Sequence, residues 1–272
     1  MSIEDLIRDA QLKANRVKLG IGFPCNYGVV PSAFLKSVLM MKKPDYELIL
    51  VEEGDLCTMR NQIVDIARAS ECTHLLMMDT DMLYHEDTIY RLLSHKLPII
   101  GALCYRRKIP FDPLMFKGKL GGYKSIDEWD KELVEVDATG TGCLMFEMKI
   151  FDEIDKIYKA EIDAFNALRP GVGILESLPD TVQRYITKLE KKCRHENVPR
   201  KYFKFRQHDD GSPIGEDIGF CSDLRNAGYK IFVDTTIPAG HLTTMVVTDE
   251  TYRWYKAVRK RQCENDRKIK VA

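Results

Sequence analysis

Residues 75–81 have the sequence Leu75-Leu76-Met77-Met78-Asp79-Thr80-Asp81, in which four apolar residues are followed directly by two carboxylates around a threonine. A short apolar run bounded by polar residues is typical of a strand that is buried on both faces of a sheet. In open α/β sheets, ligands bind outside the carboxyl ends of such strands. The stretch therefore predicts a central strand with a binding site at its end, although an isolated Asp-x-Asp is also a common turn or helix cap.

Helical and strand patterns alternate on both sides of this stretch. Apolar residues at helical spacing predict helices, and short β-rich runs that end in Gly, Pro or acidic residues predict strands. The predicted helices cover 3–16, 31–42, 58–70 and 86–95, and the predicted strands cover 17–24, 46–51, 75–78 and 98–103. Such alternation implies an α/β fold with a mainly parallel sheet, right-handed crossovers and flanking helices.

The second half of the chain departs from this alternation. Two short β-rich runs, 133–136 and 143–146, flank the Gly-rich segment 137–142 and predict two strands joined by a tight loop. Helical spacing over 152–168 and 180–193 predicts an inserted helical pair.

A last strand is predicted over 230–234, followed by a loop that holds His241 and then by a basic helical tail. We therefore expect one main domain over 1–248, with a helical insertion at about 152–204, and a basic C-terminal helical tail over 249–272.

Composition restricts the class of protein. The 41 Lys and Arg balance the 41 Asp and Glu, so net charge selects neither polyanions nor membranes. The N-terminus lacks a basic stretch followed by an apolar run, and no apolar segment is long enough to span a bilayer. Scattered cysteines without paired short spacing indicate reduced thiols, and hence a cytoplasmic protein with no membrane span. The cysteines are Cys25, Cys57, Cys72, Cys104, Cys143, Cys193, Cys221 and Cys263.

A second acidic motif follows the insertion. Gly215-Glu216-Asp217-Ile218-Gly219-Phe220-Cys221 opens a predicted helix that ends near 226–229, and the next strand leads to Gly240-His241. Together with Asp79-Thr80-Asp81, this ordered set resembles the family-2-like glycosyltransferases of the GT-A fold. The resemblance spans roughly 17–150 and 205–242, whereas 152–204 has no counterpart. It implies a GT-A type sheet and a catalytic domain over 1–248.

The resemblance also implies a metal site and a donor site. Asp81 resembles the principal ligand of a Mn or Mg ion, with Asp79 assisting and His241 contributing from the C-terminal loop. The implied donor is a UDP-linked nucleotide-sugar, and its diphosphate would need such a cation. The residues implied to lie at the donor are Phe23, Pro24, Cys25, Glu52, Arg60, Asn61, Asp79, Thr80, Asp81, Gly140 and Thr141.

Several of these residues have simpler interpretations. Arg60 is equally well explained as a solvated helix charge, and Gly140-Thr141 as part of a hairpin turn. Standing alone, His241 would be a hydrogen-bonded loop residue. For Arg60 and for Gly140-Thr141 both interpretations stay open, whereas the resemblance implies that His241 is a metal ligand.

Sugar transfer requires removal of a proton from an acceptor hydroxyl, and a positioned carboxylate can do this. Asp217 is the candidate base and Glu216 its candidate catalytic neighbour. An acidic pair in the first turn of a helix is more commonly a response to the helix dipole. A base role for Asp217 would favour inversion at the sugar carbon.

Cations and aromatics interleave just before this motif, and Arg200, Lys201 and Arg206 are candidate acceptor-binding residues. This composition suits phosphates and stacked bases, so DNA is one predicted acceptor. Compact transferases of this size also resemble virus-encoded enzymes that glycosylate modified DNA bases, which would act in the host cytoplasm. A solvated charged face is the ordinary alternative, and a glycan, a protein or a small molecule stays open as acceptor.

Two other classes of protein compete with a glycosyltransferase. A sugar nucleotidyltransferase would carry a basic, Gly-rich phosphate loop after the first strand, and Cys25-Asn26-Tyr27-Gly28 lacks the basic residue. A non-catalytic sugar- or nucleic-acid-binding module would share the site and would not hydrolyse a donor.

Overall fold

The computed structural model describes residues 3–14, 16–25, 28–108, 111–168, 178–193, 202–208, 211–244, 248–249, 251–254 and 256–257. The chain divides into two compact units, Met1–His241 and Leu242–Ala272. In the second unit, the described residues from 249 to 257 are helical.

An eight-stranded sheet forms the centre of the first unit, in the order β2-β1-β3-β10-β5-β13-β4, with β8 paired to β13. Five strands (β1, β2, β3, β5 and β13) run in one direction, and three (β4, β8 and β10) run against them. The predicted α/β class with a mainly parallel sheet is therefore confirmed. The strands are β1 Leu19–Pro24, β2 Tyr46–Val51, β3 His74–Met78, β4 Met82–Leu83, β5 Ile99–Cys104, β8 Leu133–Val136, β10 Cys143–Glu147 and β13 Ile231–His241.

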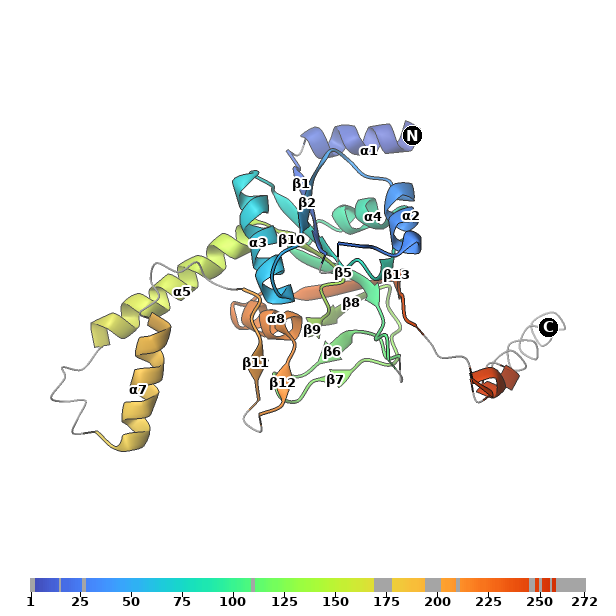
Figure 1. Ribbon diagram of the computed structural model, residues 1–272. Coiled ribbons are helices and arrows are strands. Elements are labelled where there is room, and N and C mark those ends of the chain that lie inside the picture. The colour runs from blue at the N-terminus through green and yellow to red at the C-terminus, as the bar shows by residue number, and fades with distance from the viewer. Residues whose placement is uncertain are drawn as a thin grey trace. The chain divides into compact units, whose positions relative to one another are not determined.

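Helices cover both faces of this sheet. Figure 1 shows α3 and α8 on one side of the sheet and α2 and α4 on the other. The predicted helical pair is present as α5 and α7, which follow β10 and pack against each other. The helices are α1 Ile3–Ala14, α2 Ser32–Met40, α3 Leu56–Ala69, α4 Thr88–Ser94, α5 Lys149–Leu168, α7 Asp180–Cys193 and α8 Glu216–Asn226.

Five short strands form two accessory sheets. One sheet has the order β7-β6-β9 and the other consists of β11 and β12. These strands are β6 Met115–Lys117, β7 Lys124–Ser125, β9 Ala138–Thr139, β11 Arg206–Gln207 and β12 Pro213–Ile214.

The central strands are apolar because both of their faces are covered. Every residue of β1 and β5 is buried. α3 approaches β1 so closely that a Cβ at Gly22 would lie 2.3 Å from Cγ2 of Ile63, so this position requires glycine. The parallel run β2-β1-β3 places the carboxyl ends of three strands at one edge of the sheet.

The tight loop predicted between 133–136 and 143–146 is wrong. β8 pairs with β13, whereas β10 lies between β3 and β5, so the two strands are not partners. The intervening residues are not a hairpin loop, because Ala138 and Thr139 form β9 against β6. The Gly-rich segment thus crosses the end of the sheet.

β13 continues well beyond the predicted strand at 230–234. Its pairing with β5 shifts register between Asp234 and Pro238 and then resumes. The extension pairs with β4, with Gly240 opposite Leu83 and His241 opposite Met82. This pairing brings His241 beside the acidic triplet that precedes β4.

The helical insertion returns to the core at Tyr202 and Phe203, which are 3% and 0% exposed. The Asn61 amide holds this return point: its Nδ2 donates to the Phe203 carbonyl at 2.7 Å, and its Oδ1 accepts from the Tyr202 amide at 2.8 Å. The Tyr202 hydroxyl donates to Asp155 of α5 at 2.7 Å, and Arg68 of α3 donates to both groups.

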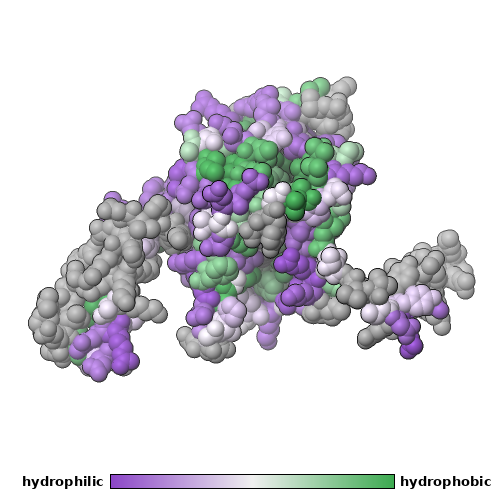
Figure 2. Space-filling view, in the orientation of Figure 1, coloured by the Kyte–Doolittle hydropathy of each residue, from purple (hydrophilic) through white to green (hydrophobic). Residues whose placement is uncertain are grey.

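One face of the edge strand β2 is uncovered. Tyr46, Leu48 and Leu50 are exposed, whereas Ile49 and Val51 pack inward. Figure 2 shows apolar side chains gathered on the upper part of the viewed surface, where Figure 1 draws β2 and α2.

Candidate active site

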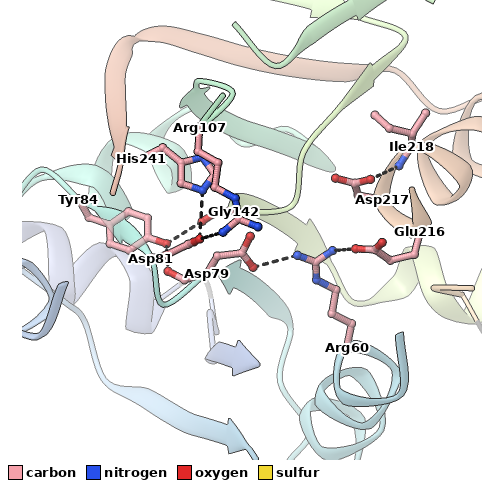
Figure 3. A network of polar contacts seen from close by, with 10 residues as sticks. All are labelled: Arg60, Asp79, Asp81, Tyr84, Arg107, Gly142, Glu216, Asp217, Ile218 and His241. Atoms are coloured by element: carbon pink, nitrogen blue, oxygen red, sulfur yellow. Dashed lines mark hydrogen bonds and ion pairs between the residues drawn. The ribbon is translucent and has the colours of Figure 1, made fainter. Parts of the chain in front are cut away.

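The acidic triplet lies at the carboxyl end of β3, as predicted, and its backbone is held firmly. The Asp79 amide donates to the Gly142 carbonyl at 3.1 Å. The buried Tyr84 hydroxyl lies 2.7 Å from the carbonyl oxygens of both Asp79 and Gly142. The triplet and the Gly-rich segment are therefore joined at one point, which Figure 3 shows in close view.

Asp81 is paired with two cationic or potentially cationic side chains. Its Oδ2 lies 2.7 Å from Arg107 Nη1 and 3.2 Å from His241 Nε2. Partial burial opposes ionisation of Asp81, but the hydrogen bond from His241 and the charges of His241 and Arg107 lower its pKa. The same hydrogen bond raises the pKa of His241 against the opposing effect of burial.

The hydrogen bonds of His241 determine its tautomer. Its Nδ1 lies 2.8 Å from the Tyr105 carbonyl oxygen, which can only accept a hydrogen bond, so Nδ1 carries a proton. In the neutral ring, Nε2 then directs a lone pair toward Asp81 Oδ2. Two electron-rich atoms facing each other require a proton or a cation between them.

Arg60 connects the two acidic motifs. Its side chain is 3% exposed; Nη2 donates to Asp79 Oδ1 at 2.9 Å and Nη1 to Glu216 Oε1. Burial opposes the charge of Arg60, but Asp79, Glu216 and Asp217 together raise its pKa. Arg60 is therefore not a solvated helix charge, and one buried cation neutralises part of a group of three carboxylates.

Asp217 lies at the start of α8, across the Gly-rich segment from Asp79. A Cβ at Gly140 would lie 3.6 Å from Asp217 Oδ2, and one at Gly142 would lie 3.3 Å from Asp79 Oδ2. The Ile218 amide donates to Asp217 Oδ1 at 2.7 Å. Burial and the neighbouring charge of Glu216 raise the pKa of Asp217 to about 6. A carboxyl that titrates near neutral pH is suited to accepting and releasing a proton.

The site also contains polar atoms without a protein partner. Among the described residues, the Thr141 hydroxyl and Nε of Arg60 are buried and have no hydrogen-bond partner. Buried polar atoms usually bind protein, water or ligand. The predicted residues Gly140 and Thr141 therefore lie where a ligand could complete the hydrogen bonding, between the two acidic motifs.

Whether these side chains fit a divalent cation can be judged from their geometry. Neutral His241, anchored through Nδ1 to a backbone carbonyl, has the arrangement common for histidines that bind metals through Nε2. Within the described part of the chain, however, no group of three or more His, Cys, Asp or Glu side chains could hold a metal ion. Asp79, the predicted assisting ligand, is directed to Arg60 instead. Asp81 and His241, one carboxylate and one imidazole, would suit a manganese-like ion that takes its other ligands from phosphate and water.

The other predicted donor residues surround the same edge of the sheet. Phe23, Pro24 and Cys25 are buried at the end of β1, and Glu52 is exposed at the end of β2. The Asn61 side chain holds the return point of the insertion, as described above, so its predicted contact with a donor stays a prediction. Thr80 is partly exposed between the two aspartates.

Of the three predicted acceptor residues, Arg200 and Lys201 lie outside the described residues. Arg206 is on β11 and forms a two-pronged ion pair with Asp223 of α8, in which Nη1 lies 3.1 Å from Oδ1 and Nη2 contacts Oδ2. Its guanidinium thus fastens β11 to α8.

Comparisons with known proteins give a likeness at the level of structure only. No family model matches the chain, and no curated protein matches it. It is similar to the crystal structure of A197 from STIV, with 13% identity over 84% of this chain and 86% of the other, at a TM-score of 0.44. It is also similar to GalNAc-T7 with UDP, GalNAc and Mn²⁺, with 9% identity over 84% of this chain and 43% of the other, at a TM-score of 0.49. Since a shared fold does not determine an activity, the chemistry has to be inferred from the side chains.

Two residues of the site were not predicted. Tyr84 follows β4 and Arg107 follows β5, and both contact the acidic triplet. Arg107 belongs to the basic run Arg106-Arg107-Lys108, one residue after the buried strand β5, which is the signal that could have identified it. No described helix is long and apolar enough to cross a membrane.

Proposed function

We propose that this chain is a metal-dependent glycosyltransferase that moves a sugar from a nucleotide-sugar, UDP-linked, to an acceptor hydroxyl. The observation that carries the proposal is the pairing of two distinct acidic centres across the Gly-rich segment. One centre, Asp81 with His241, suits a cation and a diphosphate. The other, Asp217, is a carboxyl with a raised pKa and is suited to proton transfer.

In this proposal Asp217 removes the proton from the acceptor hydroxyl. Arg60 holds Glu216 and Asp79 in place through two ion pairs, and burial together with the neighbouring charge of Glu216 keeps the pKa of Asp217 high. The Gly-rich segment lets a donor approach between the two centres, and Thr141 offers its hydroxyl. Asp81 and His241 would hold the cation, which supplies positive charge to the leaving diphosphate. Attack from the side of Asp217 favours an inverting transfer.

The acceptor is the less defined part of the proposal. DNA as acceptor is supported by the basic and aromatic composition of 200–206, but Arg206 is already paired with Asp223. The proposal for DNA therefore rests on Arg200 and Lys201 and would apply to a hydroxyl on a modified base. Glycan, protein and small-molecule acceptors use the same donor chemistry.

A screen of nucleotide-sugars by thermal unfolding, with and without Mn²⁺, tests the function. A ligand at one hundred times its dissociation constant stabilises the protein by about 2.7 kcal/mol, which is roughly 5–10 °C for a unit of this size. We expect stabilisation only with a nucleoside diphosphate and Mn²⁺ together, followed by slow donor hydrolysis. Asp81→Ala should abolish both while the protein still folds.

Asp127→Ala, which removes an exposed carboxylate after β7, is the matched control and should change neither signal. Metal-independent stabilisation by nucleotide in the parent, or an unchanged response in Asp81→Ala, would show that the acidic triplet is only a turn. Binding without any donor hydrolysis or transfer would instead favour a non-catalytic module.

A further inference from the structure

Arg107 and Arg60 flank the acidic triplet, and they differ in their freedom to move. Arg60 is 3% exposed and bonded to two carboxylates, so it is fixed. The Arg107 side chain is 58% exposed, and within the described part of the chain its ion-pair partner is Asp81, whose Oδ2 lies 2.7 Å away. Figure 3 shows it meeting Asp81 beside the His241 ring. Arg107 can therefore leave its partner without uncovering a buried charge.

The oxygen that Arg107 contacts is the same oxygen that faces His241 Nε2. A divalent cation held by Asp81 and His241 would need this oxygen. A guanidinium at ion-pair distance from it would repel that cation, because like charges at such short range repel strongly. Binding of the cation and the Arg107–Asp81 ion pair therefore exclude each other.

The backbone around Arg107 is anchored on both sides of the loop. The Arg106 amide donates to the Asp112 carbonyl at 2.8 Å, and Tyr105 bridges to Pro113. Tyr105 also supplies the carbonyl that orients His241. The Arg107 side chain can thus swing while the backbone of Tyr105 and Arg106 and the ring of His241 stay in place.

A diphosphate on the cation would place anionic oxygens within the range of the released side chain. The planar guanidinium matches two phosphate oxygens at once, which a lysine cannot do.

We propose that Arg107 is an exchangeable counter-ion: it neutralises Asp81 before the donor binds and moves to the diphosphate when a divalent cation takes its place. This inference rests on the proposed donor function and identifies the side chain that couples cation binding to diphosphate binding. The site would accordingly hold a bare cation weakly and a cation–diphosphate pair firmly.

Arg107→Ala tests both roles of Arg107, because it should raise the affinity for Mn²⁺ alone and lower the affinity for UDP at saturating Mn²⁺. Mn²⁺ alone, followed through the electron paramagnetic resonance of the free ion, should bind about 2- to 5-fold more tightly, since an exposed competing ion pair is lost. UDP at saturating Mn²⁺, measured by titration calorimetry, should bind about 10-fold more weakly, since a charged hydrogen-bonding partner is lost.

Two further variants sharpen the test. Arg106→Ala removes the same charge one residue away and should leave both affinities nearly unchanged. Arg107→Lys keeps the charge and loses the planar fork, so Mn²⁺ affinity should stay at the parent value while UDP affinity falls. Affinities that do not change in Arg107→Ala, or that both change in the same direction, overturn the exchange. A parent protein that binds Mn²⁺ but never UDP would instead refute the proposed function, and the Mn²⁺ measurement would still test the competition at Asp81.

Discussion

Asp217→Asn is expected to make the protein more stable and nearly inactive. The carboxylate at 217 sits beside Glu216 and in the field of Asp79, and the buried cation Arg60 lies among them. Asparagine has almost the same shape and can still accept the hydrogen bond from the Ile218 amide. The substitution therefore removes one charge and little else.

The size of the stability gain follows from the pKa. In the folded state the pKa of Asp217 is raised from 3.8 to about 6. The ionised carboxylate therefore lowers the free energy of unfolding by at most roughly 3 kcal/mol. Arg60 and Glu216 readjust when the charge is removed, and Asp217 keeps some contact with solvent. We therefore expect a gain of about 1–2 kcal/mol, or about 3–6 °C in melting temperature.

The sign of the effect changes with pH in a defined way. Because the folded pKa of Asp217 is raised, its carboxylate destabilises the fold fully above about pH 6, and it has no effect below its unfolded pKa. The advantage of Asp217→Asn should accordingly be present at pH 8 and vanish near pH 4. Melting temperatures measured across this range, with chelator present, give the curve. Donor binding should persist while transfer falls on the order of 100-fold.

Glu216→Gln is the matched control, because it changes the neighbouring carboxylate with the opposite expected sign. It breaks the ion pair with buried Arg60 and should destabilise the fold by about 3 kcal/mol or more. The reasoning is refuted if Asp217→Asn is destabilising at pH 8, or if its stability difference does not depend on pH. Undiminished transfer would exclude Asp217 as the base.

Three further outcomes are expected. The kcat/KM of transfer should reach a plateau above about pH 6 and fall about tenfold per pH unit below it, because Asp217 must be ionised; a flat profile would contradict this. Asn61→Ala should lower the free energy of unfolding by about 2–4 kcal/mol in chemical denaturation, because buried backbone groups lose their partners; a loss under 1 kcal/mol would contradict it. If DNA is the acceptor, binding should weaken steeply with salt, and replacing Arg200 and Lys201 by Ala should reduce the slope of log K against log salt by about 2, whereas Arg206→Ala should chiefly destabilise the fold; salt-independent binding would remove DNA from consideration.

The sequence predicted a residue's position best where that position is set by the strand directly before it. A fully apolar strand followed by acids has one common place in an α/β sheet, so the position of Asp79 and Asp81 at the end of β3 was predicted from local pattern alone, and their role stays a prediction. His241 was predicted on a loop, and the structure places it at the end of a strand, because a register shift after Asp234 is not visible in local periodicity.

Roles that depend on partners far along the chain were not predictable in the same way. Arg60 meets Glu216 across more than half the sequence, and nothing local distinguishes it from a solvated helix arginine. The loop predicted between 133–136 and 143–146 failed for a similar reason: glycine and alternating apolar residues indicate adjacent strands, but tertiary pairing with β13 and β3 prevailed.

The hydrogen bond between Tyr202 and Asp155 joins the two ends of the helical insertion, so the segment between them forms a closed loop. The chain leaves the core on α5 and comes back to the same place on α3, so the sheet does not depend on the length of what lies between. The entropic cost of closing a loop rises only slowly with its length. The segment between Asp155 and Tyr202 can therefore be shortened, extended or replaced with little effect on the two acidic centres. Proteins that share this architecture can therefore differ widely in the segment between Asp155 and Tyr202 while Asp81, His241 and Asp217 keep their positions on the sheet and α8.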